Sequence, residues 1–362
     1  MKILIAPDKF KGSLNAREVA ENIAIGLREV LPDATIAIVP MADGGEGTAE
    51  VICDALDGSW LTCNAHDPLG REINAGYAFI EKGKLAVMEM SEAAGMKRLV
   101  GKDRDASRAT TFGVGEMILD AGRRGAAKIV IGLGGSATND GGFGMARALG
   151  FRFFQTKRTR ELRSTPANLE SVEEIERPRH LLLPEIIAAA DVQNPLLGEK
   201  GATRMFGPQK GVTPDKIDMF ERALTKLADV IAHDLEIDAR NETGAGAAGG
   251  LGFGLISFCG ARIQPGFDVV AGVVGLEPKM EDADLVITGE GSLDRQTLEG
   301  KTPAGVARLA RKLGKRVIAI VGRAEEDRQV RTLFDQVYEL GGGIPQAGEL
   351  LRERARKLAG TL

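Results

Sequence analysis

The sequence predicts an α/β protein with two domains, in which a parallel-sheet domain is interrupted by a second, inserted α/β domain. Three observations lead to this prediction. Strand and helix patterns alternate at both ends of the chain, whereas the middle holds short apolar segments, helices and many loops. A chain of 362 residues is also longer than one ordinary hydrophobic core accommodates. We expect residues 1–56 and 283–362 to form the first domain and residues 57–282 to form the inserted one.

The N-terminal segment has the pattern of a strand, a helix and a second strand. Residues 2–6 and 35–39 are short apolar runs, and between them residues 16–31 repeat apolar side chains at helical spacing. Asn15, followed three positions later by Glu18, predicts an N-cap with a capping box. The turn before this helix therefore presents backbone N–H groups at a helix start.

The middle of the chain holds short apolar segments, helices and many loops. Residues 129–131 resemble a strand, residues 85–90 form a short alternating segment, and residues 186–190 are an apolar run. Residues 156–184 are rich in Arg, Glu and Pro and show no clear periodicity, so we expect a solvent-facing excursion without function there.

The C-terminal third returns to the alternating pattern. We expect strands at 285–287, 317–321 and 336–340, a helix at 303–312, and a last helix at 347–359 that packs on a sheet edge. This alternation favours a parallel sheet covered by helices.

Composition argues against several classes of protein. The net charge is −4 and no basic stripe interleaved with aromatic residues occurs, which argues against nucleic acid as a partner. Three scattered cysteines indicate a reducing compartment, and no run approaches the ~20 apolar residues of a membrane span. The sequence thus predicts a cytoplasmic protein without a membrane partner and leaves its oligomeric state open. With three histidines and no His/Cys cluster, a metal would be Mg²⁺ rather than zinc.

The glycine-rich segment after the strand at 129–131 is the most informative motif. It carries candidate anion-binding residues and a carboxylate suited to Mg²⁺, namely Gly134, Gly135, Ser136, Thr138, Asn139 and, as the metal ligand, Asp140. Glycines let backbone N–H groups approach a ligand closely, and the hydroxyl and amide groups add further donors. The motif therefore predicts phosphate handling with Mg²⁺.

The same segment fits weaker alternatives. Its Gly-x-Gly-x-x-Ala pattern matches a dinucleotide fingerprint, but no acidic residue follows roughly 20 positions later. A nucleophile elbow requires Gly where Thr138 stands. A tight turn without a ligand explains the glycines but not the four polar side chains between them.

Three further turns follow predicted strands of the first domain and carry charged or hydroxyl groups. Their candidate site residues are Asp8, Lys11 and Ser13; Asp43, Gly44, Gly45 and Glu46; and Glu290, Asp294 and Lys301. Parallel sheets bind ligands beyond the carboxyl ends of their strands, so a turn after such a strand is the expected location for a site. The last turn is not a P-loop, because Arg295 stands where that motif requires Gly. The inserted region adds Asp191, Asn194 and Lys210.

Together these motifs resemble the glycerate kinase family. The matching segments occur in order along nearly the whole chain, at residues 6–14, 42–48, 134–142, 194–198, 206–211, 246–252 and 288–291. The resemblance implies a Rossmann-like domain with an inserted second domain and an active site in the cleft between them. It also implies ATP-dependent phosphorylation of D-glycerate to 2-phosphoglycerate with Mg²⁺. Residues 156–184 depart from the family because they lack its glycine-rich hairpin, and Asn15 stands where the family often has Ser.

Phosphoryl transfer mainly requires positioning and charge neutralisation, which suggests roles for these residues. We hypothesise that Lys11, Lys210 and Lys301 neutralise phosphate or the substrate carboxylate. The candidates for Mg²⁺ ligation or for accepting the hydroxyl proton are Asp8, Asp43, Asp140, Asp191 and Asp294, with Asp191 favoured as the base. The alternatives are a kinase of another small sugar acid, phosphorylation at the 3-hydroxyl, and a non-catalytic nucleotide-binding sensor.

Overall fold

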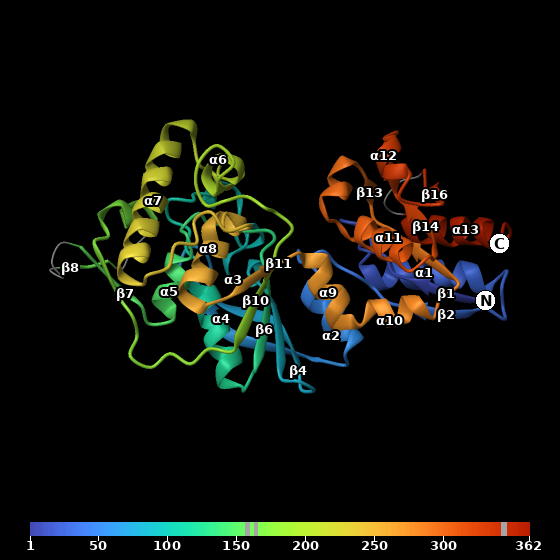
Figure 1. Cartoon of the computed structure of the whole chain (residues 1–362), viewed down its shortest axis with the longest axis horizontal. Helices are drawn as coiled ribbons and strands as arrows, with labels where there is room; N and C mark the ends of the chain where they lie inside the picture. Colours follow the sequence, from blue (N-terminus) through green and yellow to red (C-terminus); the bar gives the residue numbers. More distant parts are fainter. Residues whose placement is uncertain (156–159, 163–165, 342–345) are drawn as a thin grey trace. The chain divides into compact units, whose positions relative to one another are not determined.

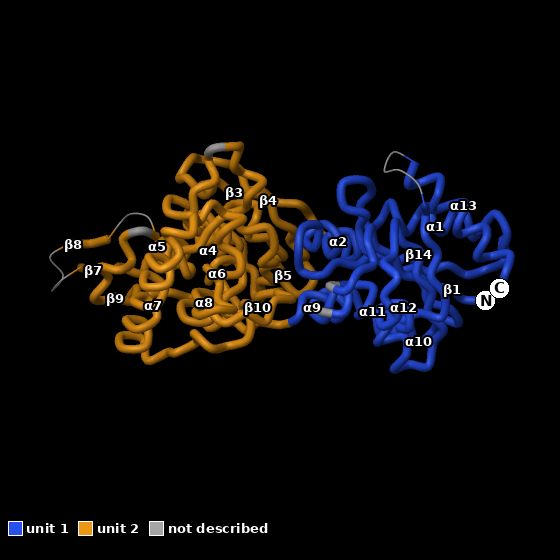
Figure 2. The backbone as a smooth tube through the Cα atoms, turned by 90° about the horizontal axis from the view of Figure 1, so that it is seen from above, with its two compact units in different colours: residues 1–57, 265–362 blue, residues 58–264 orange. Residues whose placement is uncertain are grey.

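The computed structural model describes residues 1–155, 160–162, 166–341 and 346–362. The chain forms two compact units, of which unit 1 comprises residues 1–57 and 265–362 and unit 2 comprises residues 58–264 (Figure 2). The chain returns to unit 1 at Pro265, earlier than the boundary expected at 282. The reason is local packing, because a Cβ atom at Gly266 would overlap with the Asp43 carbonyl of unit 1.

Unit 1 is built on a five-stranded parallel sheet. Its strands are β1 (Lys2–Ile5), β2 (Thr35–Ile38), β12 (Leu285–Thr288), β14 (Arg316–Val321) and β16 (Gln336–Glu339), in the order β16-β14-β12-β1-β2. In chain order this is the doubly wound arrangement 2-1-3-4-5, whose strand order reverses between β1 and β12. The turns that leave these two strands therefore lie at the topological switch point of the sheet.

Helices α1 (Ala16–Arg28) and α13 (Ala347–Ala359) pack side by side on the sheet (Figure 1). Leu27 and Leu351 lie in one core cluster with Ile5, Ile287 and Ile318 of the strands. The C-terminal helix is thus on a sheet face and not, as the sequence suggested, at an edge, because its apolar stripe is matched by that of α1. The capping box at the start of α1 is confirmed.

The remaining elements of unit 1 are short. They are α2 (Thr48–Ala55), α9 (Gly266–Val274), α10 (Leu276–Glu281), β13 (Ser292–Leu293), η6 (Arg295–Glu299), α11 (Thr302–Lys312), β15 (Arg323–Ala324) and α12 (Arg328–Arg331). α11 packs on β12 and β14, and α9 packs on α2 and α11.

Unit 2 contains a mixed six-stranded sheet. Its strands, in the order β11-β10-β6-β5-β4-β3, are β11 (Arg262–Gln264), β10 (Glu185–Ala189), β6 (Lys128–Gly132), β5 (Leu85–Glu89), β4 (Glu72–Ile80) and β3 (Ser59–His66). The first four are parallel, so their carboxyl ends share one edge, while β3 and β4 form an antiparallel hairpin.

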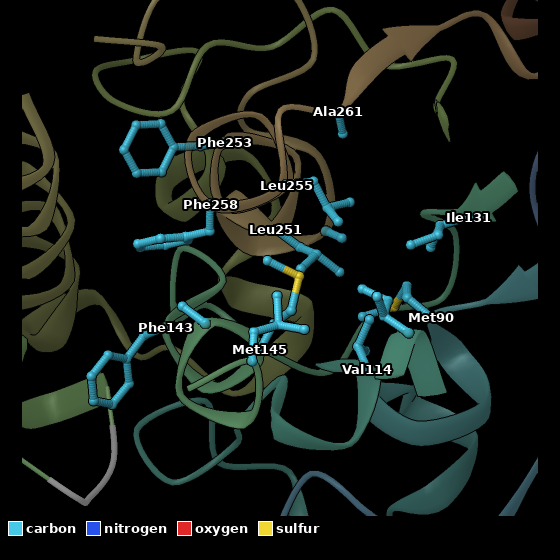
Figure 3. Packing of buried hydrophobic residues seen from close by; sticks show 14 of the residues in the cluster. Met90, Val114, Ile131, Phe143, Met145, Leu251, Phe253, Leu255, Phe258 and Ala261 are labelled. Atoms are coloured by element: carbon cyan, nitrogen blue, oxygen red, sulfur yellow. The ribbon is translucent and has the colours of Figure 1, made fainter. Parts of the chain in front are cut away.

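The helices of unit 2 close its core. They are α3 (Ser91–Ala94), α4 (Phe112–Arg123), α5 (Phe143–Ala148), α6 (Ala202–Phe206), α7 (Ile217–Asp234) and α8 (Ala247–Cys259), with the short turns η1 (Met96–Arg98), η2 (Gly101–Asp103), η3 (Pro166–Ser171), η4 (Pro208–Lys210) and η5 (Pro214–Lys216). Figure 3 shows Phe253 and Phe258 of α8, Met145 of α5 and Val114 of α4 in this core. Phe258 and Phe151 meet edge to face, with ring centroids 4.9 Å apart.

The region 156–184 differs from its expectation. Residues 156–159 and 163–165 lie outside the described residues. The described part includes β8 (Arg160–Glu161) and β9 (Glu174–Glu176), which pair with β7 (Arg152–Gln155), and it buries Leu169 and Ile175 in the core. A solvent-facing excursion was therefore wrong for this part, because apolar side chains without a regular period still reach the core.

The α/β fold class is confirmed. Within the described ranges, none of the helices combines the length and apolar character that crossing a membrane requires.

Candidate active site

Asp8 and Glu290 lie at the switch point of the unit 1 sheet. Ladder pairing continues past the strands, since the Ala6 N–H donates to the Ile287 carbonyl (2.7 Å) and the Asp8 N–H donates to the Gly289 carbonyl (2.8 Å). The turns after β1 and β12 are thereby held side by side. Both carboxylates are 8% exposed.

Burial of these carboxylates shifts their ionisation. Burial raises the pKa of Glu290 to about 8, helped by the negative charge of Asp8 and opposed by Lys301. The pKa of Asp8 is also raised, mainly by burial and then by Asp43, although the Thr302 hydroxyl donates to Asp8 Oδ2 at 2.7 Å and opposes the shift. The site thus concentrates negative charge that a cation or a proton would neutralise.

Lys301 supplies the positive charge of this cluster. Its Nζ lies 3.4 Å from Asp294 Oδ1 and 3.6 Å from Glu290 Oε1. The Asp294 N–H donates to the Thr297 hydroxyl at 3.1 Å in a capping box that opens η6, and this bond fixes the Asp294 backbone. Lys301 itself directly precedes α11, whose first-turn N–H groups add to the positive potential.

The turn after β2 brings Asp43 into the same neighbourhood. Asp43 Oδ1 accepts from the Gly45 N–H at 3.0 Å, and Gly44 adopts a φ of +85°, which glycine accommodates without strain. The Lys9 ammonium donates to the Glu46 carbonyl, while the Glu46 side chain is exposed. Asp8, Asp43, Glu290, Asp294 and Lys301 therefore lie in one charged cluster of unit 1.

Lys11 and Ser13 lie in the turn between β1 and α1. Ser13 is half-buried, and its N–H donates to the Phe10 carbonyl at 2.8 Å. Lys11 is exposed and has no ion-pair partner among the described residues. Its ammonium is available to an anionic ligand.

A second small ladder anchors the Glu290 turn. β13 pairs with β15, the Gly322 N–H donates to the Glu290 carbonyl at 3.1 Å, and a Cβ atom at Gly322 would overlap with the Gly291 carbonyl. The backbone on both sides of Glu290 is thus fixed by neighbours, which pre-organises the carboxylate cluster.

In unit 2, the glycine-rich segment follows β6 at the carboxyl edge of the sheet. Gly134 and Gly135 are accessible, and Gly135 has a φ of +72°. From Ser136 onward the segment turns into the protein, and Thr138 and Asn139 are fully buried. We call residues 134–136 the glycine corner, in which Gly134 and Gly135 are accessible and Ser136 is buried.

The Asp140 carboxylate accepts hydrogen bonds from backbone N–H groups and from a hydroxyl group. Its Oδ2 accepts from the Thr111 N–H and hydroxyl, both at 2.9 Å, and from the Gly144 N–H at 3.1 Å, while Oδ1 accepts from the Gly142 N–H at 3.1 Å. These four bonds join the starts of α4 and α5. The carboxylate that the sequence suggested as a metal ligand is therefore committed to holding the loop.

Lys210 is also turned to the protein interior. It is 2% exposed, and its Nζ donates to the Thr138 carbonyl at 2.9 Å. Burial lowers the pKa of Lys210 to about 7, opposed by the charge of Asp140. Two nearby polar atoms, Thr138 Oγ1 and Asn139 Oδ1, find no hydrogen-bond partner in the described part of the chain. Leaving such atoms unpaired costs about 1–3 kcal/mol each, so the loop conformation is maintained by other contacts.

Asp191 and Asn194 follow β10, the neighbour of β6 in the sheet. Asp191 is half-buried, and the Asn194 side chain donates to the Lys200 carbonyl at 2.7 Å. Ala189 pairs with Gly132 in register, so the Asp191 loop and the glycine corner leave the same edge of the sheet.

Two polar residues of these edges were not among the predicted site residues. Glu89 is 6% exposed at the end of β5 and pairs in register with Gly132. Thr302 is buried against Asp8. Glu89 could have been found from the sequence, because a glutamate at the end of an apolar strand is an unusual signal. Thr302 could not, because its partner Asp8 is distant in the sequence.

No trio of carboxylate, imidazole or thiolate groups within the described ranges is arranged to hold a metal ion by itself. Mg²⁺ commonly binds through one or two carboxylates together with substrate phosphates, and the unit 1 cluster is a donor set of that chemistry.

Comparisons with known proteins agree with the motifs. The sequence model of the glycerate kinase family matches residues 3–362. Glycerate 2-kinase of Escherichia coli K12 is 43% identical, with 100% of this chain and 98% of the relative covered, and a glycerate kinase of Haemophilus influenzae Rd is 39% identical, with 100% and 97% covered. A crystal structure from Salmonella typhimurium LT2, provisionally named glycerate kinase 2, superposes with a TM-score of 0.91 at 41% identity and covers 100% of this chain and 98% of its own. With this full-length agreement in sequence and fold, the chain belongs to the glycerate kinase family.

Proposed function

We propose that this enzyme uses ATP to phosphorylate D-glycerate at the 2-hydroxyl and releases 2-phosphoglycerate. The observation that carries the proposal is the 43% identity over the full length to the Escherichia coli protein named glycerate 2-kinase. Taken separately, the strand edge of unit 1 concentrates carboxylates with a lysine, and the strand edge of unit 2 presents accessible backbone N–H groups.

Charge neutralisation and positioning account for the roles of the residues. Lys11 and Lys301 are the cations that face phosphate or the glycerate carboxylate. The glycine corner offers backbone N–H groups to anionic oxygens. Asp191, a half-buried carboxylate beyond β10, accepts the hydroxyl proton.

Mg²⁺ would bind with the nucleotide and neutralise charge on its phosphates. One or two of the carboxylates of Asp8, Asp43 and Asp294 are its proposed protein ligands beside the nucleotide phosphates, because these residues belong to the cluster in which negative charge is least compensated. Asp140, which the sequence suggested as a Mg²⁺ ligand, is not among the proposed ligands, because its oxygens already accept four hydrogen bonds. The predicted cytoplasmic location stays a prediction.

The test is ATP consumption by the purified protein with Mg²⁺ and D-glycerate, with the product identified by phosphorus NMR. We expect 2-phosphoglycerate. Formation of 3-phosphoglycerate would overturn the position of phosphorylation, and turnover only with another hydroxy acid would overturn the substrate. Nucleotide binding without consumption in any of these mixtures would indicate a sensor.

A further inference from the structure

The buried continuation of the glycine corner, residues 138–141, is fixed by two segments distant in sequence. From one segment, Lys210 Nζ donates to the Thr138 carbonyl at 2.9 Å, and Thr203 Oγ1 accepts from Asn139 Nδ2 at 2.9 Å. These two residues lie on α6 and η4, which are joined only by Gly207. A single short helical segment therefore contacts both a backbone and a side-chain group of the loop.

The second segment is the start of α8. Ala248, Gly249 and Gly250 have φ values of 54°, 70° and 84°, a left-handed stretch that an alanine adopts only under strain. It brings Gly249 so close that a Cβ atom there would overlap with the Thr138 carbonyl, and the Gly141 N–H donates to the Gly249 carbonyl at 3.1 Å. The Thr138 carbonyl is thus enclosed between Gly249 and the ammonium of Lys210.

A charged donor at this place has a physical cost. Burying an ammonium is unfavourable, and an apolar side chain of similar volume often serves stability equally well or better. Asp140 provides the compensating negative charge, but its own oxygens are bonded to Thr111 and to the start of α5. Stability alone therefore does not account for a lysine here.

We propose that Lys210 is a positioning residue, which holds the glycine corner in its ligand-binding conformation through the Thr138 carbonyl and does not touch the ligand. Thr203 supports it through Asn139. The corner is two residues from Thr138 along the chain, so a rotation of the Thr138 peptide would reorient the N–H groups of residues 134–136. This inference rests on the proposed function, in which the corner binds anionic oxygens.

The test compares K210M, which keeps the stem and volume of the side chain but removes the charge, with the matched control Q209M at the exposed neighbouring position. We measure kcat, KM for ATP and for D-glycerate, thermal unfolding, and hydrogen exchange of residues 134–141. For K210M we expect at least about a tenfold fall in kcat/KM with at least a several-fold rise in one KM, together with faster exchange in the loop. Q209M should match the natural protein in each of these measurements.

A purely structural lysine gives a different pattern. Partial unfolding lowers apparent kcat with the folded fraction and leaves both KM values unchanged, and that result would overturn the proposal. If K210M does not fold, T203V decides, because it preserves volume and removes only the acceptor of Asn139. Unchanged KM values and unchanged loop exchange in T203V would also overturn the proposal.

Failure of the proposed function is recognised separately. It would show as no glycerate-dependent turnover in the natural protein. In that case loop exchange decides for Lys210, since faster exchange of residues 134–141 in K210M than in Q209M supports positioning and equal exchange rejects it.

Discussion

At the scale of single residues, Glu290 and Lys210 are buried ionisable groups whose neutral forms are favoured by their surroundings. Burial raises the pKa of Glu290 to about 8 and lowers the pKa of Lys210 to about 7. These shifts link the free energy of unfolding to pH with opposite signs. Each sign can be tested with a neutral substitution.

Glu290→Gln should remove a loss of stability at alkaline pH. The unfolded chain releases this proton near 4.5 and the folded protein near 8, so the folded state retains a proton that the unfolded state has lost between those values. Stability of the natural protein therefore falls as pH rises through this window, by on the order of 2–4 kcal/mol relative to the variant. Urea unfolding at about pH 5 and about pH 9 measures the difference. The raised pKa would be contradicted if the free energy of unfolding changed with pH in the same way in the natural protein and in Glu290→Gln. It would also be contradicted if the exposed control Glu50→Gln showed the same pH dependence as Glu290→Gln.

Lys210→Met should show the opposite dependence. Between about 7 and 10.5 the unfolded chain keeps a proton that the folded protein releases, so the natural protein gains stability as pH rises through this window. The variant lacks the titrating group and should lack that gain. Urea unfolding of both proteins at about pH 7 and about pH 9 measures this gain in stability. If the difference in stability between the two proteins did not change with pH, the lowered pKa of Lys210 would be refuted.

Lys11→Ala should reduce turnover without affecting folding. The side chain is exposed, so its removal should change the free energy of unfolding by no more than about 0.5 kcal/mol. Loss of a cation facing developing charge should lower kcat/KM by at least about tenfold. Lys82→Ala, at another exposed position, is the control for surface charge. If Lys11→Ala lost thermal stability and activity in equal proportion, the lysine would be structural.

Residue type alone did not distinguish groups that face a ligand from groups that hold a loop. Asp140 and Asp43 both follow a strand within glycines, yet Asp140 accepts four hydrogen bonds from α4 and α5 while Asp43 accepts one from its own turn. The donors to Asp140 come in part from Thr111, 29 positions earlier, and their approach depends on tertiary packing. The sequence could identify the motif but not which of its polar groups remain accessible.

At the scale of elements, the strands and helices to which local patterns gave a residue range lie within a few residues of that range. The predicted strand at 317–321 is β14 at Arg316–Val321, and the helix at 347–359 is α13 with the same bounds. Short periodic segments are specified by local physics, whereas the partner of each element is not. The sequence therefore predicted the bounds of α13 correctly but placed the helix at a sheet edge instead of a sheet face. Its packing partner, α1, lies more than 300 residues away in the sequence.

Gly26→Ala tests that α1–α13 contact. In an isolated helix, alanine is favoured over glycine by about 1 kcal/mol. Here a Cβ atom at position 26 would overlap with the Arg352 carbonyl, so we expect a net destabilisation of about 1–3 kcal/mol. Denaturant unfolding measures the sign, with the exposed Glu21→Ala in the same helix as control. A more stable Gly26→Ala protein would show that the two helices separate readily.

At the scale of the whole molecule, each unit has its own hydrophobic core. One core cluster contains only residues of 58–264, and another contains only residues of unit 1. A change in sequence pattern along the chain indicated two domains. The sequence placed the end of the inserted domain at residue 282, because residues 266–281 carry no pattern that assigns them to one sheet or the other. Contacts of α9 with α2 and α11 determine their unit.

These separate cores predict that unit 1 folds without unit 2. A chain in which residues 1–57 are joined to 265–362 by a short Gly/Ser linker should form the five-stranded sheet, because β1, β12, α1 and α13 supply its core without residues from unit 2. We expect cooperative urea unfolding and dispersed amide resonances, but no glycerate-dependent ATP consumption, since the glycine corner and Asp191 belong to the deleted unit. The full-length protein is the control for both measurements. A non-cooperative transition would show that unit 1 depends on unit 2 for its fold, and retained turnover would exclude the unit 2 edge from the active site.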